Sequence, residues 1–164
     1  MEFSGETGVQ TFTSSINPQL VMFDLDDKVS DATTDKVIIP DGPFNNGYAS
    51  LLYCSIGAED FPANDSAYIR ITHRWVAPDP IKNPVPGVTI SDYHHWRIEG
   101  IFPDGLQLNG KFNYNANGNL DNGILTDPND SIGILYRANR AADWEPVEAT
   151  RIGPFYVGFF TLPE

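Results

Sequence analysis

The sequence has little of what marks several protein classes. Its 164 residues include one cysteine, Cys54, which excludes an intrachain disulfide and any zinc cluster of several thiolates. It holds only 10 lysines and arginines against 22 aspartates and glutamates, so the formal net charge at pH 7 is -12. A charge of that sign repels phosphate backbones and anionic membrane surfaces. We therefore expect no nucleic-acid partner.

Long apolar runs and a targeting segment are also missing. The first ten residues, MEFSGETGVQ, have neither a basic start nor an apolar stretch of signal-peptide length. No later stretch is apolar for long enough to cross a bilayer, so we expect no membrane insertion. A domain excised from a longer secreted parent would also lack a signal, so this pattern leaves the compartment open.

Motifs that mark common active sites do not occur either. The chain contains no H-E-x-x-H zinc motif, no G-x-S-x-G nucleophile elbow and no glycine-rich phosphate loop between a strand and a helix. The single thiol lies in the apolar run LLYCSI, where a buried and inert cysteine is the usual outcome. We expect that the chain is not an enzyme, and we assign no catalytic, cofactor-binding or metal-ligating residue.

What the sequence does contain is short strands separated by turns. Its 14 glycines, 13 prolines and several Asn-Gly pairs are typical of turns, and helical periodicity is scarce. The clearest strand is at residues 106–114, where apolar and polar residues alternate. Further strands are predicted at residues 20–25, 36–39, 48–56, 67–76, 93–99, 132–137 and 155–162. Eight strands without a helix predict an all-β fold, an antiparallel β-sandwich that is immunoglobulin-like in broad architecture.

The length and punctuation predict one β-sandwich domain over residues 1–164. Residues 1–45 are less regular, and we expect part of them to be the end of a preceding region in a longer parent. Residues 77–87, APDPIKNPVPG, carry four prolines, which cannot donate to a sheet. This proline loop is therefore predicted to be a crossover or edge loop between two strands.

The three histidines lie on the two predicted strands that the proline loop joins. Neighbouring side chains on a strand point to opposite faces, so His94 and His95 are poorly placed to grip one metal ion. Alternation puts His73 and His94 on apolar faces, beside Ile71 and Trp96 respectively. We interpret both as hydrogen-bonded core or interface groups. The alternative is a ligand or acid-base role, for which the sequence nominates no third zinc ligand and which would need a cleft beside a nucleophile.

Residues 113–131 are rich in asparagine, aspartate and glycine, and part of this stretch imitates a calcium loop. The positions that match the spacing are Asn113, Asn115, Asn117, Gly118, Asn119 and Asp121. Ile124 stands where a bidentate glutamate belongs, which leaves the charge too low for tight binding. Asp127, Asn129 and Asp130 offer more oxygens. We interpret both clusters as turns between strands, with calcium binding as the alternative.

Aromatic side chains suggest a second kind of ligand, because sugars stack on exposed rings. Trp75 and Trp96 fall on the predicted inward faces, where burying a large ring stabilises a sandwich by roughly a few kcal/mol. Trp144, in ADWEP near a loop, is the one tryptophan that this pattern leaves free for a ligand. Glycan is therefore an alternative partner.

Three segments in order along the chain are ITHRWVAPDP, ISDYHHWRIEGIFPDG and SIGILYRANRAADWEPV. They resemble the region C-terminal to the catalytic domain in secreted aminopeptidase N-type zinc metallopeptidases of Bacteroidetes-like bacteria. NPQLVMFDLDDKV resembles the strand-turn unit just after such a catalytic domain. The zinc-binding helix, the exopeptidase motif and the catalytic glutamate of that family have no counterpart in this chain.

The resemblance implies a non-catalytic accessory module of a larger secreted metallopeptidase, with a secreted or cell-envelope location. Its partner would be the parent peptidase domain or another protein, contacted through exposed loops such as the proline loop. The alternative function is a carbohydrate- or calcium-binding module.

Overall fold

The computed structural model describes residues 11, 13–19, 21, 33–45, 51–114, 120–121, 124–125, 127 and 130–159. Ten strands and no helix occur in this part of the chain, and every strand pairing is antiparallel. An apolar helix that could cross a membrane is accordingly not found there. The predicted all-β antiparallel fold is confirmed, whereas its immunoglobulin-like detail stays a prediction.

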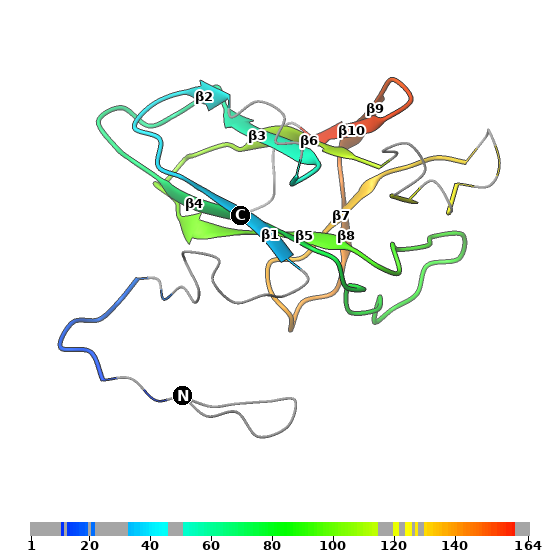
Figure 1. Ribbon diagram of the computed structural model, residues 1–164, viewed down its shortest axis with the longest axis horizontal. Coiled ribbons are helices and arrows are strands. Elements are labelled where there is room, and N and C mark those ends of the chain that lie inside the picture. The colour runs from blue at the N-terminus through cyan, green and yellow to red at the C-terminus, as the bar shows by residue number, and fades with distance from the viewer. Residues whose placement is uncertain are drawn as a thin grey trace.

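Two sheets form the two layers of the molecule (Figure 1). The first sheet contains β1 (Thr33–Ile38), β4 (Tyr68–Arg74) and β5 (His95–Ile101), with β4 in the middle. The second has the order β2-β3-β6-β10-β9. Its strands are β2 (Phe44–Asn45), β3 (Cys54–Ala58), β6 (Asn109–Asn113), β10 (Tyr156–Phe159) and β9 (Ala149–Ile152).

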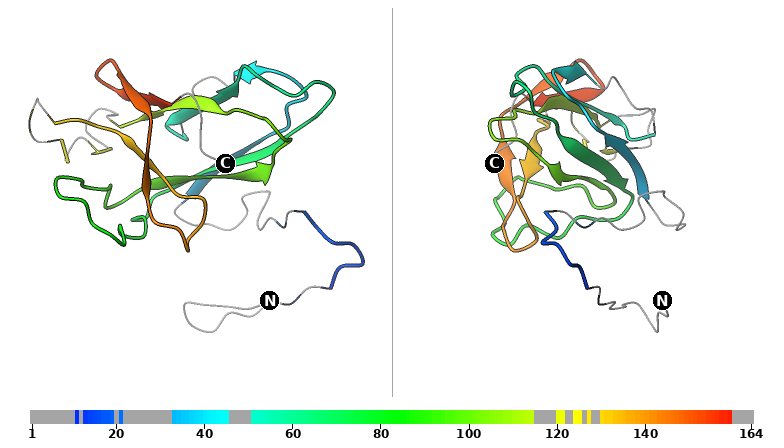
Figure 2. Two further views of the ribbon diagram at one scale, coloured as in Figure 1. Left: turned by 180° about the vertical axis from the view of Figure 1, so that it is seen from behind. Right: turned by 90° about the vertical axis from the view of Figure 1, so that its left-hand side faces the viewer.

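A separate hairpin completes the fold. It pairs β7 (Ile134–Tyr136) with β8 (Glu145–Val147), and these two strands form a sheet of their own. The hairpin lies at the end of the layers where β5 begins, as the views from front and back both show (Figures 1 and 2). Pro146 fits in β8 because this strand has a partner on one side only.

The core lies between the two layers. Trp96 of β5 packs against Phe112 of β6 with ring centroids 4.6 Å apart, and Phe112 stacks on Phe159 of β10 at 5.5 Å. The indole N–H of Trp96 also donates a 2.7 Å hydrogen bond to the carbonyl of Leu52, which precedes β3. Aromatic stacking and one directed hydrogen bond therefore join the first sheet to the second.

Alternation along β4 holds on one face only. Ile69, Ile71 and His73 are buried as predicted, but Arg70 and Thr72 on the other face are buried as well. Arg70 forms an ion pair with Asp35 of β1, and both side chains are almost inaccessible to water. The second face of β4 is therefore not a wet surface, because a buried arginine is accommodated there by a carboxylate from the neighbouring strand.

Most predicted strands exist with shifted ends. The strand predicted at residues 106–114 starts only at Asn109, because Leu106 closes a turn onto Pro103 in which Gly105 has a φ of 81°. The sequence did not predict the short strands β2, β8 and β9. The strand predicted at residues 20–25, except for residue 21, and residues 48–50 and 160–162 lie outside the described residues. The boundary near residue 45 also stays a prediction.

Candidate functional site

Three side chains from separate segments meet at one end of the first sheet. Nε2 of His73 in β4 lies 3.0 Å from Nδ1 of His94, which directly precedes β5. Nε2 of His94 lies 3.0 Å from Oδ2 of Asp121, which follows β6 in the chain. The two histidines are 0% and 1% exposed, so their predicted position as hydrogen-bonded core groups is confirmed.

Hydrogen-bond chemistry orders this histidine unit, by which we mean His73, His94 and Asp121. The carboxylate of Asp121 accepts the Nε2–H of His94, so Nδ1 of a neutral His94 is left as an acceptor. We assign the Nε2–H of His73 as its donor. Both ring nitrogens of His94 are then engaged. Nδ1 of His73 has no hydrogen-bond partner of normal geometry.

Aromatic rings enclose the inner histidine. The ring of His73 stacks on Trp96 at 4.7 Å and 10°, lies 4.3 Å from Trp75, and meets the edge of Tyr53 at 5.7 Å. Burial, and next the neighbouring His94, lower the pKa of His73 to about 4, although the Leu51 backbone and Asp121 act in the opposite direction. His73 is therefore an uncharged packing group at neutral pH.

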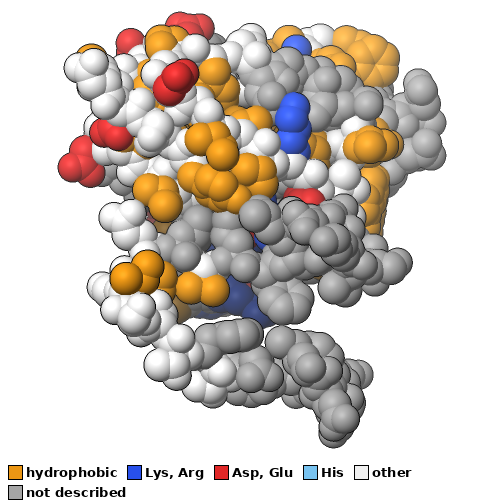
Figure 3. Space-filling model, turned by 60° about the vertical axis from the view of Figure 1, so that its left-hand side comes forward, with side chains coloured by type: hydrophobic (Ala, Val, Ile, Leu, Met, Phe, Trp, Pro, Cys, Tyr) orange, Lys and Arg blue, Asp and Glu red, His pale blue; other side chains and the backbone are white. Residues whose placement is uncertain are grey.

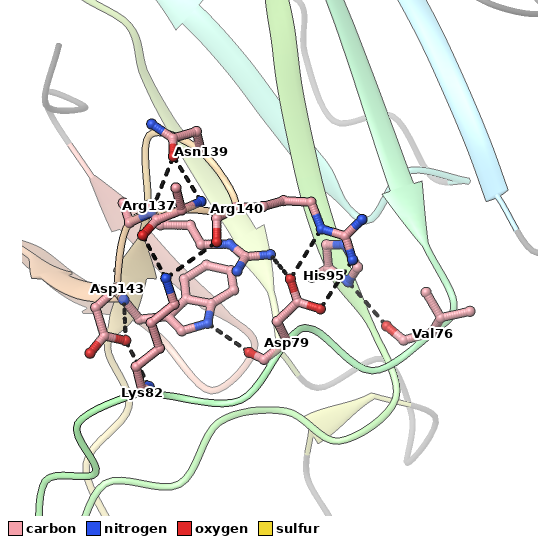
Figure 4. Close-up of polar contacts among 11 residues, drawn as sticks. Val76, Asp79, Lys82, His95, Arg137, Asn139, Arg140 and Asp143 are labelled. Atoms are coloured by element: carbon pink, nitrogen blue, oxygen red, sulfur yellow. Dashed lines mark hydrogen bonds and ion pairs between the residues drawn. The ribbon is translucent and has the colours of Figure 1, made fainter. Parts of the chain in front are cut away.

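The neighbouring histidine belongs to a different surface. Nδ1 of His95 lies 3.0 Å from the carbonyl oxygen of Val76, at the start of the proline loop (Figure 4). Burial is the main reason that the pKa of His95 is lowered. The prediction that His94 and His95 separate is confirmed, since one joins the core and the other faces the loop.

Charged side chains tie the proline loop to the turn between β7 and β8. Oδ2 of Asp79 accepts hydrogen bonds from Arg137 at 2.7 Å and from Arg140 at 3.3 Å (Figure 4). The guanidinium of Arg137 also lies 4.4 Å above the ring of Trp144, whose indole N–H donates to the Asp79 carbonyl at 2.8 Å. Hydrogen bonds from Arg140 and then Arg137 hold the pKa of the Asp79 carboxyl at about 2.

A second carboxylate fixes the same loop. Asp143 accepts hydrogen bonds from the backbone N–H groups of Lys82 and Asn83, both at 2.9 Å. The Lys82 hydrogen bond is the main reason that the pKa of Asp143 is held at about 2.

The prediction that Trp144 is free to bind a ligand is wrong. Arg137 covers its ring, and its indole N–H already donates to the Asp79 carbonyl.

The calcium-like stretch is described only in part, since residues 115–119 and Asn129 lie outside the described residues. Asn113 is buried in β6, and Asp121 belongs to the histidine unit. The Asp127 N–H donates to the Asp130 carboxylate at 2.8 Å, which supports the turn interpretation at residues 127–130. Among the residues that the structure describes, no three His, Cys, Asp or Glu side chains are placed to hold a metal ion.

A cleft of about 1650 Å³ opens between β5 and β7. Its lining includes residues 94–99 and 130–140 without a break, together with parts of the proline loop. Three lining residues each carry a buried polar atom with no hydrogen-bond partner: Nε of Arg74, Oγ of Ser91 and Oδ1 of Asp121. Nδ1 of His73 is the one further atom of this kind in the described part.

Comparison with known proteins adds no relative. None of the protein-family models, curated proteins or solved structures compared with the chain matches it.

Sequence reasoning did not find most of these residues. Asp121 was considered only as a calcium ligand, and Arg74, Arg137 and Arg140 were not considered as site residues. The arginines come from β4 and from the turn after β7, more than sixty positions apart, so no local pattern links them. The one available signal was that cations are scarce in this acidic chain, yet Arg74 lies just before the proline loop, and Arg137 and Arg140 lie in the turn between β7 and β8.

Proposed function

We propose that this chain is a non-catalytic β module that binds a ligand in the cleft between β5 and β7. This proposal is supported above all by three buried polar atoms in the cleft lining that have no hydrogen-bond partner. They are Nε of Arg74, Oγ of Ser91 and Oδ1 of Asp121. A buried polar group without a partner costs about 1–3 kcal/mol, and nearly all such groups in folded proteins are paired. A ligand that supplies the missing partners accounts for all three.

The side chains near the cleft support a non-catalytic role. Ser91 lines the cleft with His94, but both nitrogens of His94 are engaged by His73 and Asp121, so none is left to take a proton from a hydroxyl. Burial raises the pKa of the Cys54 thiol to about 12, so no thiolate forms at neutral pH. The described residues thus offer no activated nucleophile.

The setting we propose is an accessory position in a larger secreted metallopeptidase. The support is the likeness of the three quoted segments to the region behind such a catalytic domain. One side of the proline loop is held by the hairpin turn, while Val85 and Val88 are exposed and free for a partner domain. Apolar side chains also gather in the middle of the face shown in Figure 3. A module of this kind would hold substrate or position the peptidase.

The observations favour a ligand other than sugar or calcium. An exposed flat ring is what a sugar needs, yet Trp75 and Trp96 pack against His73 and Arg137 lies over Trp144. Calcium needs carboxylate oxygens, yet Asp121 already accepts a hydrogen bond from His94. Polysaccharides and calcium are nevertheless included as test ligands in the experiment below.

Two glycine variants test cleft binding. A Cβ atom added at Gly133, which lines the cleft, or at Gly42, which does not, would meet no atom within 4 Å. We expect a peptide digest of casein to shift the amide resonances of β5 and β7, and we expect Gly133→Trp to reduce these shifts strongly by obstructing the cleft beside β7. Gly42→Trp is the matched control and should bind like the unmodified protein.

The proposal is overturned if casein peptides, neutral and acidic polysaccharides and calcium all leave the cleft resonances unchanged, or if Gly133→Trp has no effect on binding. Its non-catalytic part fails if the purified chain hydrolyses aminoacyl p-nitroanilides in a metal-dependent way. The peptidase setting is tested separately, by whether the purified chain binds a peptidase domain encoded in the same open reading frame.

A further inference from the structure

The cleft borders the edges of two strands and also reaches the inward faces of β6 and β10, at Phe112 and Val157. One face of a strand contributes every second residue, because successive side chains alternate. Residues 94–99 and 133–137 line the cleft consecutively, so the cleft runs along the outer edges of β5 and β7. Both are edge strands, and in the described part of the chain no backbone hydrogen bond joins either outer edge to another segment. Two rows of free backbone donors and acceptors therefore face the cleft.

One end of the cleft carries an excess of positive charge. Arg74 ends β4 and is opposite His95 in the β4–β5 register, and no hydrogen bond or ion pair of its side chain occurs among the described residues. Arg137 and Arg140 share a single carboxylate, that of Asp79. Arg74, Arg137 and Asp79 all act electrostatically on His95, which places them around one point. Two guanidinium groups thus share one carboxylate, and the guanidinium of Arg74 lies near them without an ion pair among the described residues.

The remaining charged groups at this end do not cancel that excess. The charge of Asp143 is offset by Lys82, whose Nζ donates to the carbonyls of Arg140 and Ala141. Glu99 of β5 is paired with Arg97, and Asp121 accepts a hydrogen bond from His94. Burial lowers the pKa of His95, so at neutral pH its ring adds no further charge. The excess stands out in a chain whose formal net charge is -12. Guanidinium groups match the planar geometry of a carboxylate and bind it through paired hydrogen bonds.

Strand direction links the free edges to the charged end. β5 begins at His95 beside this arginine cluster, Arg74, Arg137 and Arg140, whereas β7 ends next to Arg137. A segment that pairs antiparallel with β5 would therefore finish at the cluster with its own C-terminus. The cleft volume of about 1650 Å³ also exceeds the roughly 300–1,000 Å³ of a typical small-molecule pocket.

We propose that the ligand is an extended peptide that adds a strand to the free edge of β5 and places its C-terminal carboxylate among Arg74, Arg137 and Arg140. This inference rests on the proposed cleft-binding function and names its ligand class. Main-chain hydrogen bonds to β5 provide the affinity of such a complex, and the arginine cluster selects a free chain end. The carboxylate also gives the unpartnered Arg74 an acceptor.

Two peptides that differ only at the chain end test the assignment by calorimetry. The probe is an N-acetylated hexapeptide of alternating valine and threonine, prepared once with a free C-terminal carboxylate and once with a C-terminal amide. We expect the free acid to bind about tenfold tighter or more, because the amide removes a charge-assisted pair with the guanidinium groups. Hydrogen exchange should show alternate amides of β5 gaining protection.

Arginine variants show where the selectivity resides. Arg74→Gln should reduce the difference between the two peptides without unfolding the protein, since the Arg74 side chain has no hydrogen-bonded partner to lose. Arg151→Gln is the matched control, because Arg151 is an exposed arginine of β9 outside the cleft lining. This variant should keep the full preference for the free acid.

Each of the other possible results would overturn a different part of the proposal. Equal affinity for acid and amide, with binding still sensitive to Gly133→Trp, removes the carboxylate assignment and leaves cleft binding intact. An amidated peptide ending in glutamate that binds as well as the free acid moves the assignment from the chain end to a side chain. Binding of polygalacturonate but of neither peptide replaces the ligand class. If no probe binds in the cleft, the proposed function itself fails.

Discussion

The histidine unit and the Asp79 network use similar residue types in opposite surroundings. Each combines a carboxylate, nitrogen donors and tryptophan rings from segments that are distant in sequence. His73 and His94 are at most 1% exposed, whereas the side chains of Asp79 and Arg140 are 41% and 87% exposed. In the interior the uncharged His73 packs against aromatic rings, while at the surface the charged groups of Asp79, Arg137 and Arg140 hold a loop. Exposure to water, more than residue type, therefore separates a core cluster from a surface network.

The largest predicted effect on stability comes from removing the buried ring of His73. His73→Ala should lower the free energy of unfolding by about 3–5 kcal/mol, as truncation of a buried aromatic side chain does, because the ring contacts two tryptophans and His94. His95→Ala is the matched control and should cost less than about 1 kcal/mol, since one exposed hydrogen bond is lost. Urea denaturation measures both. Equal losses would contradict the assignment of only one histidine to the core.

The second largest predicted effect is a pH dependence of stability that comes from the buried His73. The pKa of His73 is about 4 in the folded chain against 6.5 ordinarily, so between these values the unfolded chain binds a proton that the folded chain excludes. Stability is therefore complete above about pH 6.5 and should fall by about 3 kcal/mol as the pH decreases to 4.

The variant His73→Phe supplies the control for that titration. It keeps a stacked ring without a titrating group, so the stability loss between pH 6.5 and 4 should be much smaller in urea denaturation. A pH dependence unchanged by His73→Phe would show that other groups dominate this window. The exposed Asp79 network titrates lower, because its carboxyl pKa is held at about 2.

The smallest predicted effects compare two tryptophan N–H groups. Trp96→Phe should cost about 1–3 kcal/mol, because it leaves the carbonyl of the buried Leu52 without its donor. Trp144→Phe should cost about 1 kcal/mol or less, since water can replace the lost donor to the Asp79 carbonyl near the surface. Hydrogen exchange should show faster exchange in the proline loop for Trp144→Phe only. A larger global loss for Trp144→Phe would break the comparison.

How far sequence reasoning reached depends on how local each feature is. Alternation correctly placed Ile69, Ile71 and His73 on a buried face and separated His94 from His95. It does not account for the burial of Arg70 on the opposite face, where a carboxylate from β1 lies beside the guanidinium. A strand pattern describes only its own two faces and contains no information about what a neighbouring strand offers.

The residues of the candidate site show even more clearly that a local sequence pattern does not reveal contacts with distant segments. Trp144 was predicted to be free because it lies near a loop, yet a loop more than fifty residues earlier supplies the Asp79 carbonyl that accepts its N–H. Asp121 was considered with its sequence neighbours, although its partner is His94. Ion pairs and hydrogen bonds of this kind form across the fold, so they depend on chain packing that periodicity does not encode.

The sequence by itself determined the all-β character, the strand alternation and the scarcity of positive charge, because these follow from local backbone preference and composition. Only the tertiary structure decided that the buried His73 and His94 join Asp121 and that three arginines gather where β5 begins. The physical reason is that burial and through-space charge set the roles of these groups, and both arise only when distant segments pack together.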